Sequence, residues 1–481
     1  MKRWWKRLLP GILAVLLLAG CGQRAPKDSD LLNPESPVYL TVWHYYNGAQ
    51  LTAFNELVDE FNRTRGKELG IVVEGFSHGS VTDLENNVLS AANGNVGADE
   101  IPNMFAAYAD NAYAIDQMGL AADLTEYLTQ EELDRFISSY IDEGRFTDDG
   151  SVKIFPLAKS VELFLLNKSD WEPFAQETGA SYEDFATMEG LAATAQAYYE
   201  WTDSQTPEPN DGKAFFGRDA MANYILIGAM QLGTEIFSVK DGEFHLNFDK
   251  NTMRTLWDNY YIPYIKGYFA AAGRFRSDDV KTGTVLSFVG SSSGATFFPD
   301  QVILSDTESY PIEMDVFPCP QFTGGRPYAV QQGAGMVVTK GEPAQVYASV
   351  EFLKWITQDE NNIEFSIDSG YLPVSKSAND MELIQAQKGD IKPVMEQILS
   401  VAVDTVNRNT LYTPKAFAGG SAGRAILEDA MSQAAVEDRA VVEERLAQGE
   451  NLAQATAEFT SDEHFDQWYQ DTLAQLEALT E

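Results

Sequence analysis

The sequence predicts an α/β protein of two lobes, each a mostly parallel sheet flanked by helices, with hinge strands joining the lobes. Three observations favour this fold. The chain has 481 residues, more than one hydrophobic core usually supports. Strand-like runs alternate with amphipathic helical patterns near the N-terminus, as in parallel sheets covered on both faces. Residues 154–168 and 317–376 carry the extended runs and glycine-proline turns that a chain crossing between lobes needs.

The first 37 residues are expected to lie outside both lobes. A basic run precedes an apolar run of about a dozen residues, shorter than the ~20 that a membrane-spanning helix needs, so residues 1–20 are predicted to be a signal peptide. The run ends in Leu-Ala-Gly before Cys21, which looks like a bacterial lipobox whose cysteine is acylated. Residues 21–37 are polar and broken by proline, so they are expected to form a tether. The predicted location is the extracellular face of the cell membrane, with the lipid on Cys21 as anchor.

The composition excludes several classes of protein. The chain has 34 basic and 72 acidic residues, and such an acidic surface repels nucleic-acid backbones. Cys319 is the second and last cysteine, so acylation of Cys21 leaves no intramolecular disulfide. No metal or cofactor is expected, because the chain lacks H-E-x-x-H and C-x-x-C spacings and its four histidines lie far apart. No phosphate-binding loop of the G-x-x-x-x-G-K-[ST] type is present, so any ATP hydrolysis must belong to a partner.

The N-terminal elements are predicted as strands at 38–46, 70–76 and 104–110, with helices at 51–61 and 80–92 between them. In parallel sheets, ligands bind beyond the carboxyl ends of the strands. Aromatic rings there could pack on sugar rings, although a core position is the ordinary alternative for each ring. The ligand-binding candidates at these strand ends are Trp43, His44, Tyr45, Ser80, Tyr108 and Asp110.

The first crossing, residues 154–168, contains two charges within an apolar run. Lys159 and Glu162 would be costly in a buried strand unless they are paired or face a cleft. Both are therefore candidates for the ligand cleft. The alternative is an edge strand whose charges are solvated.

Residues 168–280 are predicted to be mainly helical, with helices at 188–201, 219–232 and 250–267. A strand ending near residue 290 follows, and helix and turn are expected to resume after it. The tail from 391 to 481 is rich in Ala, Glu, Gln and Leu, which indicates helices with a solvated acidic face.

The turn after that strand, Gly-Ser-Ser-Ser-Gly at 290–294, formally matches the G-x-S-x-G elbow of serine hydrolases. The match is weak, because small-residue turns often satisfy this pattern. A hydrolase of this type would also need a later histidine, and His464, in the acidic helical tail, is the only one. Ser291 and Ser292 are instead ligand-binding candidates, since a serine turn at a helix N-terminus offers backbone N–H groups and hydroxyls. Plain helix capping is the alternative.

The second crossing begins with a β-rich run that Gly333 and Gly335 interrupt, which suggests hinge freedom. An amphipathic helix follows, with Val346, Val350, Leu353 and Ile356 expected on one face, and a second turn returns the chain at Gly370. Gln332 and Tyr371, at the edges of this stretch, are candidate ligand contacts. The predicted lobes are residues 38–157 plus 335–372 and residues 158–334 plus 373–481.

Five segments carry a resemblance to a known family: LAGC, LTVWHYYNGAQLTAFNELVDEFN, PLAKSVELFLLNK, GGRPYAVQQGAGMVV and EFLKWITQDENNIEFSIDSGYLPVSK. The chain resembles extracellular solute-binding protein family 1, the lipoprotein receptors of sugar-type ABC importers, related in fold to maltose-binding protein. It departs at 181–185, where Tyr182 stands in place of a common tryptophan.

The resemblance implies a type II periplasmic-binding-protein-like fold and a monomer that is not an enzyme. It also implies that the protein captures a solute, expected to be a sugar or oligosaccharide, by lobe closure and delivers it to the permease subunits of an ABC importer. The alternatives are a secreted carbohydrate-active hydrolase and a surface glycan-binding lipoprotein without a transport role.

Overall fold

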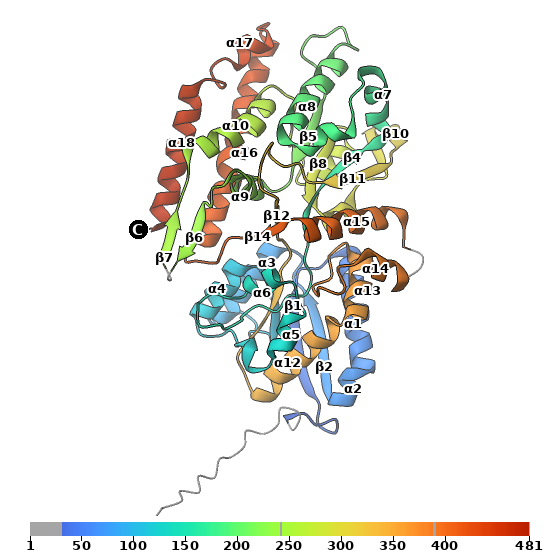
Figure 1. Cartoon of the computed structure of the whole chain (residues 1–481), viewed down its shortest axis with the longest axis vertical. Coiled ribbons are helices and arrows are strands. Elements are labelled where there is room, and N and C mark those ends of the chain that lie inside the picture. The colour runs from blue at the N-terminus through green and yellow to red at the C-terminus, as the bar shows by residue number, and fades with distance from the viewer. Residues whose placement is uncertain (1–30, 241–242, 388–390, 481) are drawn as a thin grey trace, which may run out of the picture.

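The computed structural model describes residues 31–240, 243–387 and 391–480, so the predicted signal peptide and Cys21 lie outside the described residues. Two lobes lie one above the other in Figure 1, with helix α15 (Pro393–Arg408) and the short strands β12 (Tyr328–Val330) and β14 (Thr410–Tyr412) between them. None of the helices in the described ranges is both long and apolar enough to cross a membrane.

The first lobe, at the bottom of Figure 1, is built on a four-stranded sheet in the order β13-β3-β1-β2. Strand β1 (Val38–His44) pairs in parallel with β2 (Ile71–Ser77) and β3 (Met104–Ala107). Strand β13 (Gly335–Val338) joins antiparallel to β3. The helices of this lobe are α1 (Gly48–Arg63), α2 (Arg65–Leu69), α3 (Val81–Ala92), α4 (Ala109–Gln117), α5 (Gln130–Asp134), α6 (Ser138–Asp142), α12 (Pro343–Ile356) and α13 (Asp359–Ser369).

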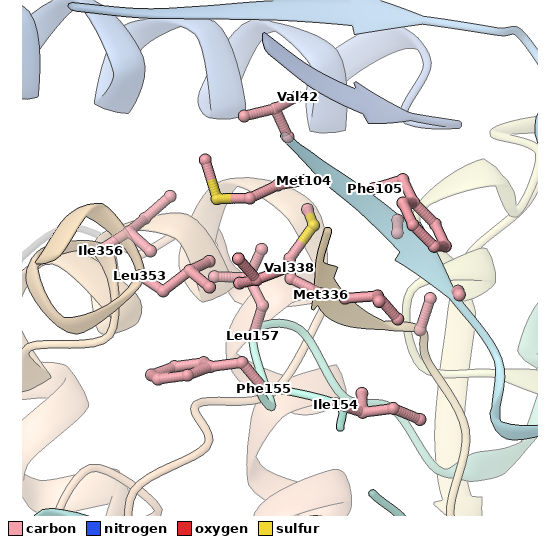
Figure 2. Close-up of a cluster of buried hydrophobic side chains, with 14 of the residues drawn as sticks. Val42, Met104, Phe105, Ile154, Phe155, Leu157, Met336, Val338, Leu353 and Ile356 are labelled. Carbon is pink, nitrogen blue, oxygen red and sulfur yellow. The ribbon is translucent and has the colours of Figure 1, made fainter. Parts of the chain in front are cut away.

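The core of the first lobe joins parts of the chain that are far apart in sequence. Figure 2 shows side chains from the sheet packed against the first crossing and against helix α12. The labelled residues are Val42, Met104, Phe105, Ile154, Phe155, Leu157, Met336, Val338, Leu353 and Ile356. The predicted apolar face of the helix that returns to this lobe is confirmed, because Leu353 and Ile356 are buried there.

The second lobe is built on a sheet in the order β11-β4-β8-β5. Here the expectation of mostly parallel pairing is wrong in detail. Only β5 (Ala214–Arg218) and β8 (Val285–Ser291) run parallel, whereas β4 (Glu162–Asn167) is antiparallel to β8 and to β11 (Met314–Pro318). Strand β4 enters directly from the other lobe, so no helical crossover sets its direction.

Strand β4 is buried along its whole length, which explains its continuous apolar run. Phe164 and Leu166 face one hydrophobic cluster, while Leu163 and Leu165 face another on the opposite side of the sheet. The helices of this lobe are α7 (Lys168–Thr178), α8 (Met188–Asp203), α9 (Met221–Leu232), α10 (Lys250–Ile265), α11 (Arg276–Lys281), α14 (Met381–Gln387), α15, α16 (Gly420–Ala447), α17 (Leu452–Thr456) and α18 (Asp462–Glu477).

Several short strands were not predicted. Helix and turn were expected after residue 290, but β9 (Gln301–Ser305), β10 (Glu308–Pro311) and β11 lie there. The hairpin of β6 (Phe237–Lys240) and β7 (Glu243–Leu246) and strand β5 also interrupt the region expected to be helical. Such segments of four or five residues are too short to show a clear period, and β9 buries only one side chain.

Three segments that cross between the lobes lie side by side: one around Ser160 in the first crossing, and two in the second crossing, around Gln332 and around Leu372. Ser160 and Gln332 exchange two backbone hydrogen bonds of 3.0 Å, and the N–H of Leu372 donates to the carbonyl of Lys159 at 2.6 Å. A steric requirement accounts for the glycines here: a Cβ on Gly333, whose φ is +86°, would overlap the carbonyl oxygen of Ala158. Gly335 is equally enclosed.

Candidate ligand-binding cleft

A cavity of about 460 Å³ lies between the lobes. Its walls come from both lobes and from the crossing segments, so a molecule inside it would touch all three. The lining residues are Val81, Glu85, Tyr108, Ala109, Asp110 and Glu143 from the first lobe, Gln331 and Gln332 from the crossings, and Asn223, Leu226, Phe237, Thr413, Pro414, Phe417, Gly420, Ser421, Arg424, Ala425 and Glu428 from the second lobe.

Three of the sequence-predicted site residues line this cavity: Tyr108, Asp110 and Gln332. Tyr108 and Asp110 stand where β3 ends and α4 begins, at the carboxyl end of a parallel strand. Burial raises the pKa of Asp110 to about 6; the nearby Arg424 guanidinium opposes this effect and the Glu143 carboxylate adds to it. The Oε1 atom of Gln332 is buried and has no hydrogen-bond partner.

Lys159 lies behind the cavity wall instead of in it. Its side chain is fully buried, forms an ion pair with Glu143 and donates to the carbonyl of Gly333 at 2.7 Å. The solvated edge-strand alternative is therefore wrong. Glu143, which also accepts a hydrogen bond from Gln331, is the member of this group that lines the cavity.

Glu162 is likewise buried and paired, here with Arg218. The Nδ2 of Asn223 donates to Glu162 at 2.9 Å, and the guanidinium of Arg424 donates to Asn223 Oδ1. A chain of polar contacts thus runs from the cavity, at Arg424 and Asn223, into the second lobe. Glu162 holds the orientation of Asn223 without lining the cavity itself.

Tyr45 and Tyr371 support the crossings. Their hydroxyls lie 3.4 Å apart, and the N–H of Ala334 donates to the Tyr45 hydroxyl at 3.3 Å. Neither residue lines the cavity, so both contact the crossings without facing the cavity.

Trp43 and His44 do not reach the cleft. Trp43 lines a separate hollow on the first lobe, where its ring lies 4.5 Å from that of His78. His44 is buried between the rings of Tyr46 and Phe54, and burial lowers its pKa to about 4. Strand residues alternate between faces, so being near a strand's end does not bring a side chain to the cleft.

The three serines also lie elsewhere. Ser80 caps helix α3, where its hydroxyl accepts the N–H of Asp83. Ser291 accepts the N–H of Gly294 at 2.9 Å, and Ser292 is buried, with its N–H bonded to the carbonyl of Val161. His464, on α18, hydrogen-bonds to Asp438 of α16 and to Tyr261 of α10, and not to these serines.

The sequence did not single out most of the cavity's charged and aromatic residues. Glu85, Glu143 and Arg424 lie on helices or loops whose polar residues were indistinguishable from a solvated face. Arg424 carries one retrospective signal: it is a cation in the first turns of α16, shortly after the pair Gly419-Gly420.

The cavity combines flat apolar faces with hydrogen-bonding groups. Phe417, which lines the cavity, stacks on Phe244 with ring centroids 4.1 Å apart, and this contact supports the Phe417 ring. Amides and carboxylates line other walls. Among the described residues, no group of three or more His, Cys, Asp or Glu side chains is arranged to hold a metal ion.

Comparisons with solved structures identify the fold. The cyclic α-maltosyl-1,6-maltose binding protein of Arthrobacter globiformis matches with a TM-score of 0.66 and 18% identity, over 92% of this chain and 99% of that one. UgpB of Mycobacterium tuberculosis in complex with glycerophosphocholine matches with a TM-score of 0.65 and 18% identity, again over 92% and 99%. The maltose/maltodextrin-binding domain MalE of Bdellovibrio bacteriovorus bound to maltotriose gives 0.60 and 13%, over 91% and 100%. At such identities the likeness shows the two-lobe α/β fold alone.

No curated protein sequence matches the chain significantly. A family model described as "Bacterial extracellular solute-binding protein" matches residues 56–392. The match includes both crossing segments and most of both sheets. Because it extends over well more than half of the chain, the protein belongs to the bacterial extracellular solute-binding protein family.

Proposed function

We propose that this protein is a membrane-anchored receptor that captures a sugar or oligosaccharide in its cleft and delivers it to the permease of an ABC importer. The two lobes close on the solute and hold it between them. The proposal takes residues 38–157 plus 335–372 as one lobe and residues 158–334 plus 373–481 as the other.

The observation that carries the proposal is the cavity whose walls come from both lobes and from the crossings. A solute that touches both lobes favours the closed arrangement, because it loses contacts when the lobes separate. Tyr108 and Phe417 offer flat faces, and Asp110 and Gln332 offer hydrogen-bond acceptors for hydroxyls. The solved structures of similar fold include proteins bound to maltotriose and to glycerophosphocholine.

A ligand screen tests capture. Thermal shifts of the chain without residues 1–20 would be measured against mono-, di- and trisaccharides, polyols and their phosphates, and each mixture would be checked for products. We expect one sugar class to raise the melting temperature and to be recovered unchanged. Turnover of the sugar would instead favour the hydrolase alternative, and no shift with any sugar would contradict the proposal.

The membrane anchor has a separate test, because it depends on Cys21. Cys21→Ser is expected to release the full-length protein from the membrane fraction of the expressing bacterium. A variant that stays wholly in that fraction would show that the anchor lies elsewhere.

A further inference from the structure

The cavity walls carry more negative than positive side chains. Four carboxylates line it, from Glu85, Asp110, Glu143 and Glu428, against the single guanidinium of Arg424. Because a charge enclosed between two lobes is poorly screened, this balance acts on any ion that enters.

Two of these carboxylates already have partners. Glu143 pairs with Lys159. Glu428 accepts the backbone N–H groups of Met221 and Ala222 at the N-terminus of α9, at 3.1 and 2.8 Å. The other two carboxylates, of Glu85 and Asp110, lie on the neighbouring helices α3 and α4, where Glu85 accepts a hydrogen bond from the Asn111 side chain and Asp110 has the Arg424 guanidinium nearby. Each disfavours the charge of the other, and burial raises the pKa of the Glu85 carboxyl, with Asp110 adding to the effect.

The features that could attract an anion are occupied. The guanidinium of Arg424 donates to Asn223 and lies close enough to Asp110 to lower the pKa of that carboxyl. The N-terminus of α16, where an anion would otherwise be favoured, is faced by the Asp110 carboxylate, which lies against Gly420. An incoming phosphate or carboxylate would have to displace these contacts.

The walls also hold acceptors without donors. Gln331, 5% exposed, and Gln332 both line the cavity, and the Oε1 atom of each is buried with no hydrogen-bond partner among the described residues. The Nε2 of Gln331 is held by Glu143 and by the carbonyl of Ser139, which fixes the amide's orientation. A buried acceptor left unpaired costs free energy, so these positions favour a ligand that supplies O–H or N–H groups.

We infer that the cleft selects its solute by charge: it rejects anionic sugars and prefers an amino sugar, whose protonated amine faces Asp110 and Glu85, to the corresponding neutral sugar. The inference rests on the proposed function and narrows its substrate class. The amine would bring N–H donors and a positive charge to the two carboxylates. A phosphate or uronate would bring only acceptors and a negative charge to the same place.

The test uses β-1,4-linked trisaccharides of glucose, glucosamine and glucuronic acid, together with glucose, glucosamine and glucose 6-phosphate. Dissociation constants would be measured by calorimetry at pH 7 and low salt with the chain without residues 1–20. We expect the amine to bind severalfold more tightly than the neutral sugar, and the acid at least about tenfold more weakly. An anionic sugar that binds as tightly as the neutral one, or an amine that binds no more tightly, would overturn the inference while leaving sugar capture intact. Absence of binding by all six would contradict the proposed function itself, and the inference with it.

Variants assign the selectivity to the two carboxylates. In Glu85→Gln/Asp110→Asn, the ratio between the amine and neutral affinities is expected to fall to near one. Asp429→Asn/Glu437→Gln is the matched control, because it removes the same two charges from exposed positions of α16 that line a different groove. A ratio that falls equally in the control would attribute the preference to the net charge of the protein instead of to the cleft.

Discussion

The Asp110 carboxyl lies where the two lobes meet. It belongs to the first lobe, yet Gly420 and Arg424 of the second lobe cover it. Its pKa of about 6 lies above the ordinary 3.8, so folding favours the protonated form. The stability that this group contributes is therefore present in acid and lost as the pH rises from about 4 to 6.

Asp110→Asn should raise the stability of the ligand-free protein at pH 7.5 by about 2 kcal/mol and leave it nearly unchanged at pH 4. The charged groups that face Asp110 are Glu85, Glu143 and Arg424, and all three remain in the variant. The measurement is chemical denaturation of both proteins from pH 4 to pH 8. A difference that does not change with pH would show that Asp110 ionises without a penalty.

The buried pair of Lys159 and Glu143 yields a second residue-level prediction. Lys159→Met leaves the Glu143 carboxylate near the cavity without its cation, which should cost about 3–5 kcal/mol. Adding Glu143→Gln removes the orphaned charge, so the double variant should be more stable than Lys159→Met alone. Urea denaturation of the two singles and the double measures the coupling, and simple additivity would mean that the pair contributes nothing.

At the scale of elements, the crossing at Gly333 leaves no room for a side chain at that position. Gly333→Ala should destabilise the protein by about 1–3 kcal/mol more than Gly324→Ala. Both glycines have positive φ, +86° and +71°, and so both substitutions strain the backbone. Only the Cβ at 333 meets neighbours, the Ala158 carbonyl and the Cα of Lys159 at 2.9 Å, whereas nothing lies within 4 Å at 324. Equal losses of stability for the two variants in thermal unfolding would show that the crossing accommodates the added methyl group without a cost in free energy.

Elements with strong periodicity were predictable, while short or isolated ones were not. The helix with Leu353 and Ile356 on one face was predicted and is buried as expected. Strand β4 was predicted as extended, but its antiparallel pairing depends on contacts with β8 and β11 that no local pattern encodes.

At the scale of the whole molecule, the two lobes touch through Gly420 of α16. A Cβ there would overlap Oδ1 and lie 2.9 Å from Cγ of Asp110. Gly420→Ala should therefore hold the lobes apart, which increases the radius of gyration in solution scattering and weakens sugar binding about tenfold. Gln433→Ala, an exposed position on the same helix, is the control and should change neither quantity. A Gly420→Ala protein as compact as the parent would show that Asp110 moves aside.

The candidate site was predictable only in part, because some of its residues come together only through contacts between distant parts of the chain. Tyr108, Asp110 and Gln332 were found because strand ends and crossings have local signals. Glu85 comes beside Asp110 only through the packing of α3 on α4, and Arg424 reaches the same cavity only where the two lobes meet. Trp43 was expected there and instead lies beside His78, because a strand's two faces cannot be told apart without the packing of the other elements.

The ribbon of three hydrogen-bonded crossings has a mechanical consequence. When one body turns about a narrow axis, points beside the axis travel little and distant points travel far. If the lobes close by turning about the crossings, as proposed above, Gln332 lies beside the axis, whereas Arg424 lies on α16, away from the crossings. A solute first held by the amide at the pivot would thus meet groups that barely shift during closure, and the helix would arrive last. In this proposed closure, the crossings would determine where the solute binds, and the contacts from α16 would determine how slowly it dissociates.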